Sequence, residues 1–304
     1  MKEKNSFTED LGMREYLERF FTDFTYEKED AAHLLCSYDT ISSNERASAL
    51  LQECIALYEK DHHLDYKREI LETRAKMIAE ETALHPYTVE LLIFICLSRH
   101  LRTLYEQKGL PCDIYRDSML DLKWKLTECK LVKGICGSFV AAWFPGFFDL
   151  TRFALGRLQF EIVDFGHHYE KNGIVLTPET KVINVHIPRT GGPMDKESCD
   201  ASYQQARAFF ADIVGENAPF VCHSWLLFPE HREMLSPTSN IYRFMSEYEI
   251  LKSGVNSGSD LWRFFDTDEK DPEKLPTDTS LRRAYVAYLK NGGRPGWGFG
   301  VKFD

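Results

Sequence analysis

Asn184 and His186 lie two residues apart in a run whose side chains could do acid–base chemistry. The run KVINVHI (181–187) alternates, which predicts a strand with Asn184 and His186 on one face. A histidine, with an ordinary pKa of about 6.5, suits a general base near neutral pH. The other interpretation of His186 is a histidine hydrogen-bonded in a structural role. Glu161, in the strand-like run LQFEIVDF, is a second candidate base, for which a solvated charge at a sheet edge is the favoured explanation.

A glycine-rich loop follows this strand and could bind an anion. Ile187 is followed by Pro188, Arg189, Thr190, Gly191 and Gly192, and a helix is expected to start near Asp195 or Ser198. Glycines let backbone N–H groups face a ligand, and a helix N-terminus adds partial positive charge, so a pyrophosphate could sit there. The alternative is an ordinary turn between a strand and a helix. A second cluster, GGRPGWGFG (292–300), precedes no predicted helix and indicates a strand with a close backbone approach or a bulge.

Cys222, His223 and Ser224 suggest a hydrolase or an acyl-enzyme, but their spacing argues against both. Neighbouring residues of a strand point to opposite faces, so Cys222 and His223 cannot activate one another without a bulge. The chain also has no G-x-S-x-G motif. His223 could share a site with His186 if their strands are neighbours, and packing beside Trp225 is the alternative.

The charge balance and the apolar runs exclude two classes of partner. The chain has 304 residues, with 37 Lys and Arg against 47 Asp and Glu, so its net charge is −10. Clustered positive charge supplies non-specific affinity for nucleic acid, so no nucleic-acid partner is expected. The apolar runs are shorter than the roughly 20 residues of a membrane-spanning helix, and the N-terminal residues lack the apolar core of a secretory signal. We therefore expect a cytoplasmic protein that neither spans nor binds a membrane.

Cysteine and histidine spacing gives no support for a metal site. The eight cysteines include no C-x-x-C pair, which weakens both zinc and redox motifs. They are expected to be small core residues in a reducing compartment. The pairs His62–His63 and His167–His168 lie in polar turns without a further ligand at helical spacing, so solvated loops are expected and no metal is predicted.

The hydrophobic period is helical over the first half of the chain. Apolar stripes at helical spacing occur in SNERASALLQECIALYEKDHH, HPYTVELLIFICLSRHLRTLYEQKG and YRDSMLDLKWKLTECKLV. In the second of these, Pro86 fits the first turn and Gly109 the C-terminal cap. The sequence thus predicts an all-helical domain over residues 1–156.

The period changes to two after Gly156. LQFEIVDF, GIVLT and KVINVHIP are expected to form an antiparallel meander, and FVCHSWLLF reads as a central strand. A helix with Tyr203, Ala206, Phe210 and Ile213 on one face should follow the loop. YEILKSGV, LWRFF and GWGFGVKF read as further strands, with short helices over SPTSNIYRFMSEYE and TSLRRAYVAYLKNGG. Residues 157–304 are therefore predicted to be a mixed-sheet domain, and the fold class is α+β.

Several of these segments resemble a known family. Five segments resemble a GNAT-like C-terminal domain: VINVHIPRTGG, FVCHSWLLFP, SNIYRF, LPTDTSLRRAYVAYL and GWGFG. In a family of bacterial N-acyltransferases, a helical N-terminal domain accompanies the GNAT-like domain. Two further segments resemble that helical domain: DLKWKLTECK and FPGFFDLTRFALGRLQFE. The resemblance implies acyl transfer from acyl-CoA or acetyl-CoA, as co-substrate, to a small-molecule amine or a peptide.

The resemblance also implies which residues would bind coenzyme A. The family holds the pyrophosphate in a loop of the pattern Gln/Arg-x-x-Gly-x-Gly/Ala, which Arg189 and Gly192 match, whereas Pro193 and Met194 depart from it. Backbone amides at the strand end polarise the thioester, and here they would be those of His186 or Ile187. The implied cofactor-binding residues are Ile187, Arg189, Thr190, Gly191, Gly192 and Asn240.

The family tyrosine that protonates the leaving thiolate is missing at its usual place. The chain reads Phe244-Met245 there, which leaves Tyr242 or Tyr248 as candidates. His186 and His223 are the expected catalytic residues of a direct transfer. The alternative is a catalytically degenerate domain that binds acyl-CoA or a partner protein without turnover. The sequence leaves a homo-oligomer open.

Overall fold

The chain divides into two compact units, which are described separately. The computed structural model describes residues 11–190, 192–256, 258 and 261–303. The N-terminal unit comprises Met1–Lys130 and Gly134–Asp149, and the C-terminal unit comprises Leu131–Lys133 and Leu150–Asp304. The expected boundary after residue 156 would separate strands β1 (Arg152–Leu155) and β2 (Leu158–Asp164), which pair as a hairpin, so β1 lies with the C-terminal unit.

Helices build the described part of the N-terminal unit. α5 is its central helix, since every residue from Leu91 to Leu97 is buried and it packs against α1, α2, α3 and α4. As predicted, Pro86 begins α5, and Gly109 follows its end with a positive φ of 66°. The helices are α1 (Met13–Asp23), α2 (Lys28–Ser43), α3 (Glu45–Lys60), α4 (Arg68–Thr82), α5 (Pro86–Gln107), α6 (Cys112–Lys133) and α7 (Pro145–Phe148), with short 3-10 turns η1 (Asp65–Lys67) and η2 (Ala141–Trp143).

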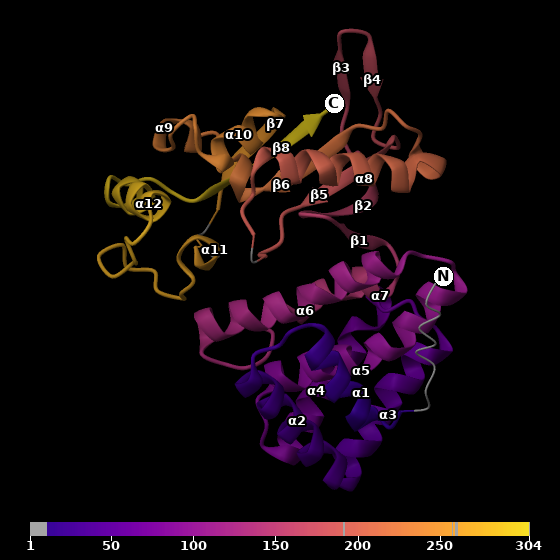
Figure 1. Cartoon of the computed structure of the whole chain (residues 1–304). Coiled ribbons are helices and arrows are strands. Elements are labelled where there is room, and N and C mark those ends of the chain that lie inside the picture. The colour runs from indigo at the N-terminus through magenta and orange to yellow at the C-terminus, as the bar shows by residue number, and fades with distance from the viewer. Residues whose placement is uncertain (1–10, 191, 257, 259–260, 304) are drawn as a thin grey trace. The chain divides into compact units, whose positions relative to one another are not determined.

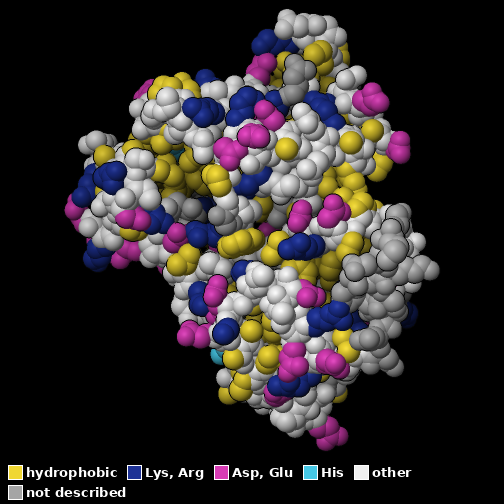
Figure 2. All heavy atoms as spheres, in the orientation of Figure 1, with side chains coloured by type: hydrophobic (Ala, Val, Ile, Leu, Met, Phe, Trp, Pro, Cys, Tyr) yellow, Lys and Arg dark blue, Asp and Glu magenta, His cyan; other side chains and the backbone are white. Residues whose placement is uncertain are grey.

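The helices of the described residues are all too short or too polar to cross a membrane. Acidic and basic side chains are interspersed over the face drawn in Figure 2. That mixture agrees with the modest acidic excess of the sequence.

A six-stranded mixed sheet is the centre of the C-terminal unit. Its strand order is β1-β2-β5-β6-β8-β7, and α8 lies across one face against β1, β2 and β5 (Figure 1). The pairs are antiparallel except β5–β6, which is parallel. The remaining strands and helices are β3 (Tyr169–Lys171), β4 (Ile174–Leu176), β5 (Lys181–His186), α8 (Lys196–Val214), β6 (Phe220–Ser224), η3 (Trp225–Leu227), α9 (His231–Met234), α10 (Asn240–Ser246), β7 (Glu249–Val255), α11 (Trp262–Phe265), α12 (Ser280–Lys290) and β8 (Gly296–Lys302).

The predicted three-stranded meander is wrong, because β3 and β4 form their own two-stranded sheet. β2 pairs directly with β5, and the β3–β4 hairpin projects from the sheet (Figure 1). Asn172 and Gly173 have positive φ values of 53° and 81° and form the turn, as an Asn-Gly pair favours. Ile174 and Val175 near the turn are exposed, whereas Tyr169 and Leu176 at the base of the hairpin are buried, so only the base packs against the rest of the unit.

Two further expectations in this unit are wrong. The run LWRFF is helical, since Leu261, Phe264 and Phe265 are buried at helical spacing around α11. Ile213 is 69% exposed near the end of α8, whereas Phe210 of the same predicted stripe is buried.

The glycines of β8 allow close backbone approach, as predicted. A Cβ at Gly298 would lie 2.2 Å from the Leu227 carbonyl oxygen, and one at Gly296 would lie 2.2 Å from the Phe228 ring. The absence of side chains therefore lets the η3 segment pack directly on the sheet.

Candidate active site

Strands β5 and β6 stop pairing before either of them ends. β5 pairs with β2 along its full length, and β6 pairs with β8 from Phe220 to Ser224. Between β5 and β6, however, the ladder comprises Ile183 with Phe220 and Asn184 with Val221. Beyond these pairs, the facing edges of the two strands carry main-chain N–H and C=O groups with no ladder partner across the gap. An extended chain with amide groups could pair with these edges.

Three polar side chains meet beside this gap, on β2 and β5. His186 Nε2 lies 2.7 Å from Glu161 Oε1, and Asn184 Nδ2 lies 3.1 Å from both of these atoms. The antiparallel register, which places Glu161 opposite Asn184, brings them together. The shared face of Asn184 and His186 is therefore confirmed, and we call these residues with Glu161 the β2–β5 cluster.

Glu161 is an ion-paired carboxylate and not the solvated edge charge that we expected. Its side chain is 16% exposed, and Arg152 Nη2 of β1 donates a hydrogen bond of 2.9 Å to Oε2. Burial alone would raise the pKa of Glu161. The hydrogen bond and charge of His186, with the charge of Arg152 and the Asn184 hydrogen bond, outweigh burial and lower this pKa to about 2. The cluster therefore presents His186 with a carboxylate partner that is ionised near neutral pH.

His223 lies outside the β2–β5 cluster. It is exposed on β6, and its ring packs edge-on against Trp297 with 4.6 Å between the ring centroids. The adjacent Cys222 is fully buried on the opposite face, and burial raises the pKa of its thiol. The predicted alternation of these two residues is thus confirmed, and a buried neutral thiol is unsuited to carry an acyl group.

The loop after β5 is held by an ion pair to the end of α11 and by a hydrogen bond between two of its own residues. Arg189 forms an ion pair with Asp266 at the end of α11, and Asp266 also accepts a hydrogen bond of 2.7 Å from Arg282. The Gly192 N–H donates to Thr190 Oγ1 over 3.3 Å. Gly191, another predicted cofactor-binding residue, lies outside the described residues. The expected phosphate ligand Arg189 is therefore engaged by a carboxylate in this structure.

Helix α8 starts one residue after Asp195, as the sequence predicted. The Asp195 carboxylate accepts a hydrogen bond of 2.8 Å from the Ser198 N–H, and this bond lowers the pKa of Asp195. Asn240 begins α10, and Ser239 caps that helix by accepting a hydrogen bond from the Tyr242 N–H.

Tyr248 is poorly placed to supply a proton. Its side chain is 3% exposed, and its hydroxyl lies 2.8 Å from that of Tyr203. Burial raises the pKa of Tyr248 well above its ordinary value. Tyr242 on α10 is half-buried and is the candidate of the two with access to solvent.

Polar groups also gather in the N-terminal unit at Asp61, His62 and His63. Their ligand atoms lie within 4.8 Å of one another. The Asp61 carboxylate, however, already accepts a hydrogen bond from His63 and lies 3.0 Å from the Lys67 ammonium. A metal ion would have to compete with this cation for the carboxylate.

Sequence reasoning missed Arg152 and Arg157. The first pairs with Glu161 across the β1–β2 hairpin, and the second lies in the two-residue turn between those strands. The hairpin itself was the available signal, because a two-residue turn at Gly156 and Arg157 places Arg152 opposite Glu161.

Comparisons with known proteins agree with this geometry. Residues 152–302 match the GNAT-like C-terminal domain, and residues 15–150 match the N-acyltransferase N-terminal domain. No curated protein matches the chain in sequence. A solved acyltransferase in complex with decanoyl-CoA is 21% identical with a TM-score of 0.75, and one in complex with decanoyl-CoA and teicoplanin is 20% identical with a TM-score of 0.73. Each comparison covers 94% of this chain and 87% of the other, and at such identity it shows the fold.

The strand order, the parting of β5 from β6 and the helix after the loop define an acyltransferase of the GNAT-like class. The chain belongs to the N-acyltransferases that combine a helical N-acyltransferase N-terminal domain with a GNAT-like C-terminal domain.

Proposed function

We propose that this protein transfers an acyl group directly from acyl-coenzyme A to an amine, with His186 as the general base. The observation that supports this role is the 2.7 Å contact between His186 and a carboxylate, at the end of the strand that parts from β6. Glu161 would orient the imidazole and stabilise the imidazolium that forms. His223, which lies outside the β2–β5 cluster, is the second residue that we expect near the substrates.

The facing edges of β5 and β6 beyond their ladder suit the donor. Pantetheine carries two amide groups, which can pair with the main-chain groups of β5 and β6 beyond the two pairs of their ladder. The pyrophosphate would lie at the loop formed by Arg189, Thr190, Gly191 and Gly192, and Asn240 would also hold coenzyme A. The amide of Ile187 would polarise the thioester carbonyl, which Pro188 cannot do because it has no N–H.

The reaction transfers one acyl group to the amine nitrogen, which loses one proton. The neutral amine attacks the thioester carbonyl carbon, and His186 takes a proton from the nitrogen. The C–S bond then breaks with its electron pair on sulfur, and the thiolate takes up a proton from solvent. His186 returns to its neutral form by releasing its proton to solvent.

The solved relatives suggest which substrates to try first. Their complexes contain decanoyl-CoA, octanoyl-CoA and teicoplanin, so medium-chain donors and glycopeptide amines belong in the screen beside acetyl-CoA and small amines. All eight cysteines are free thiols, which supports a cytoplasmic enzyme with access to acyl-coenzyme A.

A binding protein without turnover is the second candidate. It is favoured by Phe244-Met245 at the place of the family tyrosine and by the buried Tyr248 hydroxyl. Thermal melts with coenzyme A and acyl-coenzyme A species would establish donor binding, since a ligand at 100 times its dissociation constant adds about 2.7 kcal/mol of stability.

Replacement of His186 separates the two candidates. We expect His186→Asn to lower turnover by at least about a hundredfold while the affinity for coenzyme A changes little. His168→Asn is the matched control, because His168 is an exposed histidine of the same unit. Full activity of His186→Asn would refute the proposed base, and donor binding without any acyl transfer by the wild type would favour the binding protein.

A further inference from the structure

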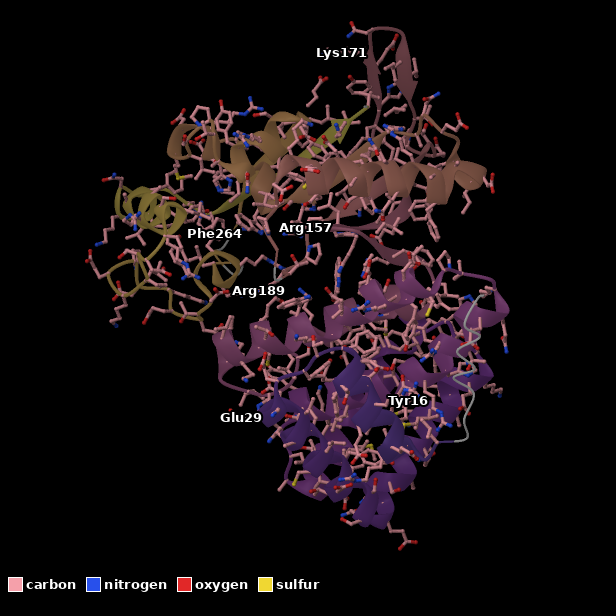
Figure 3. The ribbon with its side chains drawn as sticks, viewed as in Figure 1. Tyr16, Glu29, Arg157, Lys171, Arg189 and Phe264 are labelled. Atoms are coloured by element: carbon pink, nitrogen blue, oxygen red, sulfur yellow. The ribbon has the colours of Figure 1, made fainter. Side chains whose placement is uncertain are left out.

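The guanidinium of Arg157 joins the two ends of the loop after β5. Arg157 Nη1 donates a hydrogen bond of 3.0 Å to the Pro188 carbonyl, and Nε donates one of 3.1 Å to the Pro193 carbonyl. Figure 3 labels Arg157 in the β1–β2 turn and Arg189 in the loop. Two neighbouring nitrogens of one side chain therefore link the prolines at the two ends of the loop.

Helix α8 fixes the backbone of Arg157. Ser202 Oγ accepts hydrogen bonds from the N–H groups of Arg157 (2.7 Å) and Leu158 (3.3 Å), and it donates to the Ser198 carbonyl (3.0 Å). Gly156 has a φ of +70°, and a Cβ there would lie 2.8 Å from Ser202 Oγ. The turn, the first half of α8 and the loop are thus connected through one serine and one arginine.

The orientation of the two carbonyls has a consequence for the loop's amides. The C=O and N–H of a trans peptide unit point in opposite directions, so a carbonyl that points at the Arg157 guanidinium turns the N–H of its own peptide unit away from it. The prolines at both ends have no N–H, so among the described loop residues the main-chain donors are the amides of Arg189, Thr190 and Gly192, of which the last donates to Thr190 Oγ1 in this structure. The positive charge of the half-buried Arg157 adds to the attraction for an anion.

We infer that Arg157 is a positioning residue that holds this loop in the conformation that receives the diphosphate of coenzyme A. It sets the affinity for the nucleotide half of the donor and leaves the thioester end unaffected. The inference rests on the proposed function, because it assumes that coenzyme A is the donor.

The test compares Arg157→Met with Arg207→Met. Arg207 of α8 is a matched control, since it also donates to backbone carbonyls, those of Glu216, Ala218 and Phe303, and has no contact with the loop in its described hydrogen bonds. Dissociation constants are measured for coenzyme A and for pantetheine, which lacks the diphosphate. We expect Arg157→Met to weaken coenzyme A about tenfold or more, to leave pantetheine within about twofold, and Arg207→Met to change neither. Arg157→Lys, which can reach one carbonyl, should restore part of the affinity.

Hydrogen exchange of the free protein tests the bracing without a ligand. The amides of Gly192 and Met194 should exchange faster in Arg157→Met than in the wild type, and unchanged rates in Arg207→Met are expected. If Arg157→Met does not fold, Ser202→Ala releases the same turn and should reproduce the selective loss of coenzyme A affinity.

The outcomes are distinguishable. Wild-type affinity of Arg157→Met for coenzyme A would overturn the inference and leave the proposed function intact. An equal loss for coenzyme A and pantetheine would show a general structural role and overturn it too. A wild-type protein that binds neither ligand would refute the proposed function, and this inference with it.

Discussion

We expect the C-terminal unit of the wild type to lose stability in acid as Glu161 becomes protonated. The Glu161→Gln variant should not show this loss. Its contacts with His186, Asn184 and Arg152 outweigh burial and lower its pKa from 4.5 to about 2. The unfolded chain therefore binds this proton at a higher pH than the folded chain. The stabilisation is complete above about pH 4.5 and is lost as the pH falls toward 2.

The pKa difference gives the size of the effect. The gap between 4.5 and about 2, at about 1.4 kcal/mol per pKa unit, corresponds to about 3 kcal/mol. At pH 3 the unfolded state has bound most of this proton and the folded state little of it, so about 2 kcal/mol of that stabilisation is already lost. The side chain is 16% exposed, so solvent screens this contribution only in part.

Urea unfolding of wild type and Glu161→Gln from pH 6 to pH 3 measures this contribution. Pulse-labelled hydrogen exchange read on peptides from β2 and β5 assigns the transition to the C-terminal unit. Other carboxylates with lowered pKa values titrate in both proteins and cancel in the difference. We expect the stability advantage of the wild type to shrink by about 2 kcal/mol over this range.

A constant difference between the two proteins would refute the reasoning. It would mean that Glu161 binds its proton at the same pH in the folded and unfolded chains, contrary to its contacts. Glu170→Gln provides the control, because Glu170 is exposed on β3 and its replacement should leave the pH dependence unchanged.

Two other substitutions test packing around the site. Gly298→Ala should lower the melting temperature strongly and destabilise the C-terminal unit by about 3 kcal/mol or more, since its Cβ would lie 2.2 Å from the Leu227 carbonyl oxygen. Tyr248→Phe removes the hydroxyl that contacts Tyr203, so unfolding free energy should fall by about 1 kcal/mol while turnover persists, as measured by urea unfolding and product chromatography.

Each of these two predictions would be contradicted by a specific result. An unchanged melting temperature for Gly298→Ala would show that η3 can move away from β8. Gly12→Ala is its control, because a Cβ at Gly12 would meet nothing within 4 Å. Loss of turnover in Tyr248→Phe at wild-type stability would assign Tyr248 to the chemistry after all.

Local periodicity was enough to predict the elements with one buried face. The stripe of α3 and the alternation of β5 are visible in the sequence because each segment buries residues at a regular spacing. Local periodicity failed to predict α11, because a run of five residues with four apolar members fits a strand as well as a helical turn. It also failed for β3 and β4, whose outer residues are polar or exposed and are paired through an Asn-Gly turn.

The candidate site was predictable only within one strand. Asn184 and His186 share a face by alternation alone, so their proximity could be predicted. Their contact with Glu161 depends on the register of β2 against β5, which no local pattern specifies. The bridge from Arg157 to the loop additionally requires the β1–β2 turn to lie on α8, a tertiary contact between distant parts of the chain.

The parting of β5 from β6 has a consequence for how such a protein evolves. The groups along the two inner edges belong to the main chain, and every residue except proline supplies them alike. Substitutions along these edges therefore preserve the donors and acceptors, whereas an inserted or deleted residue displaces all that follow it. Selection on this feature acts on strand length and alignment more than on residue identity, so lineages can diverge widely in sequence while they inherit the same hydrogen-bonding array.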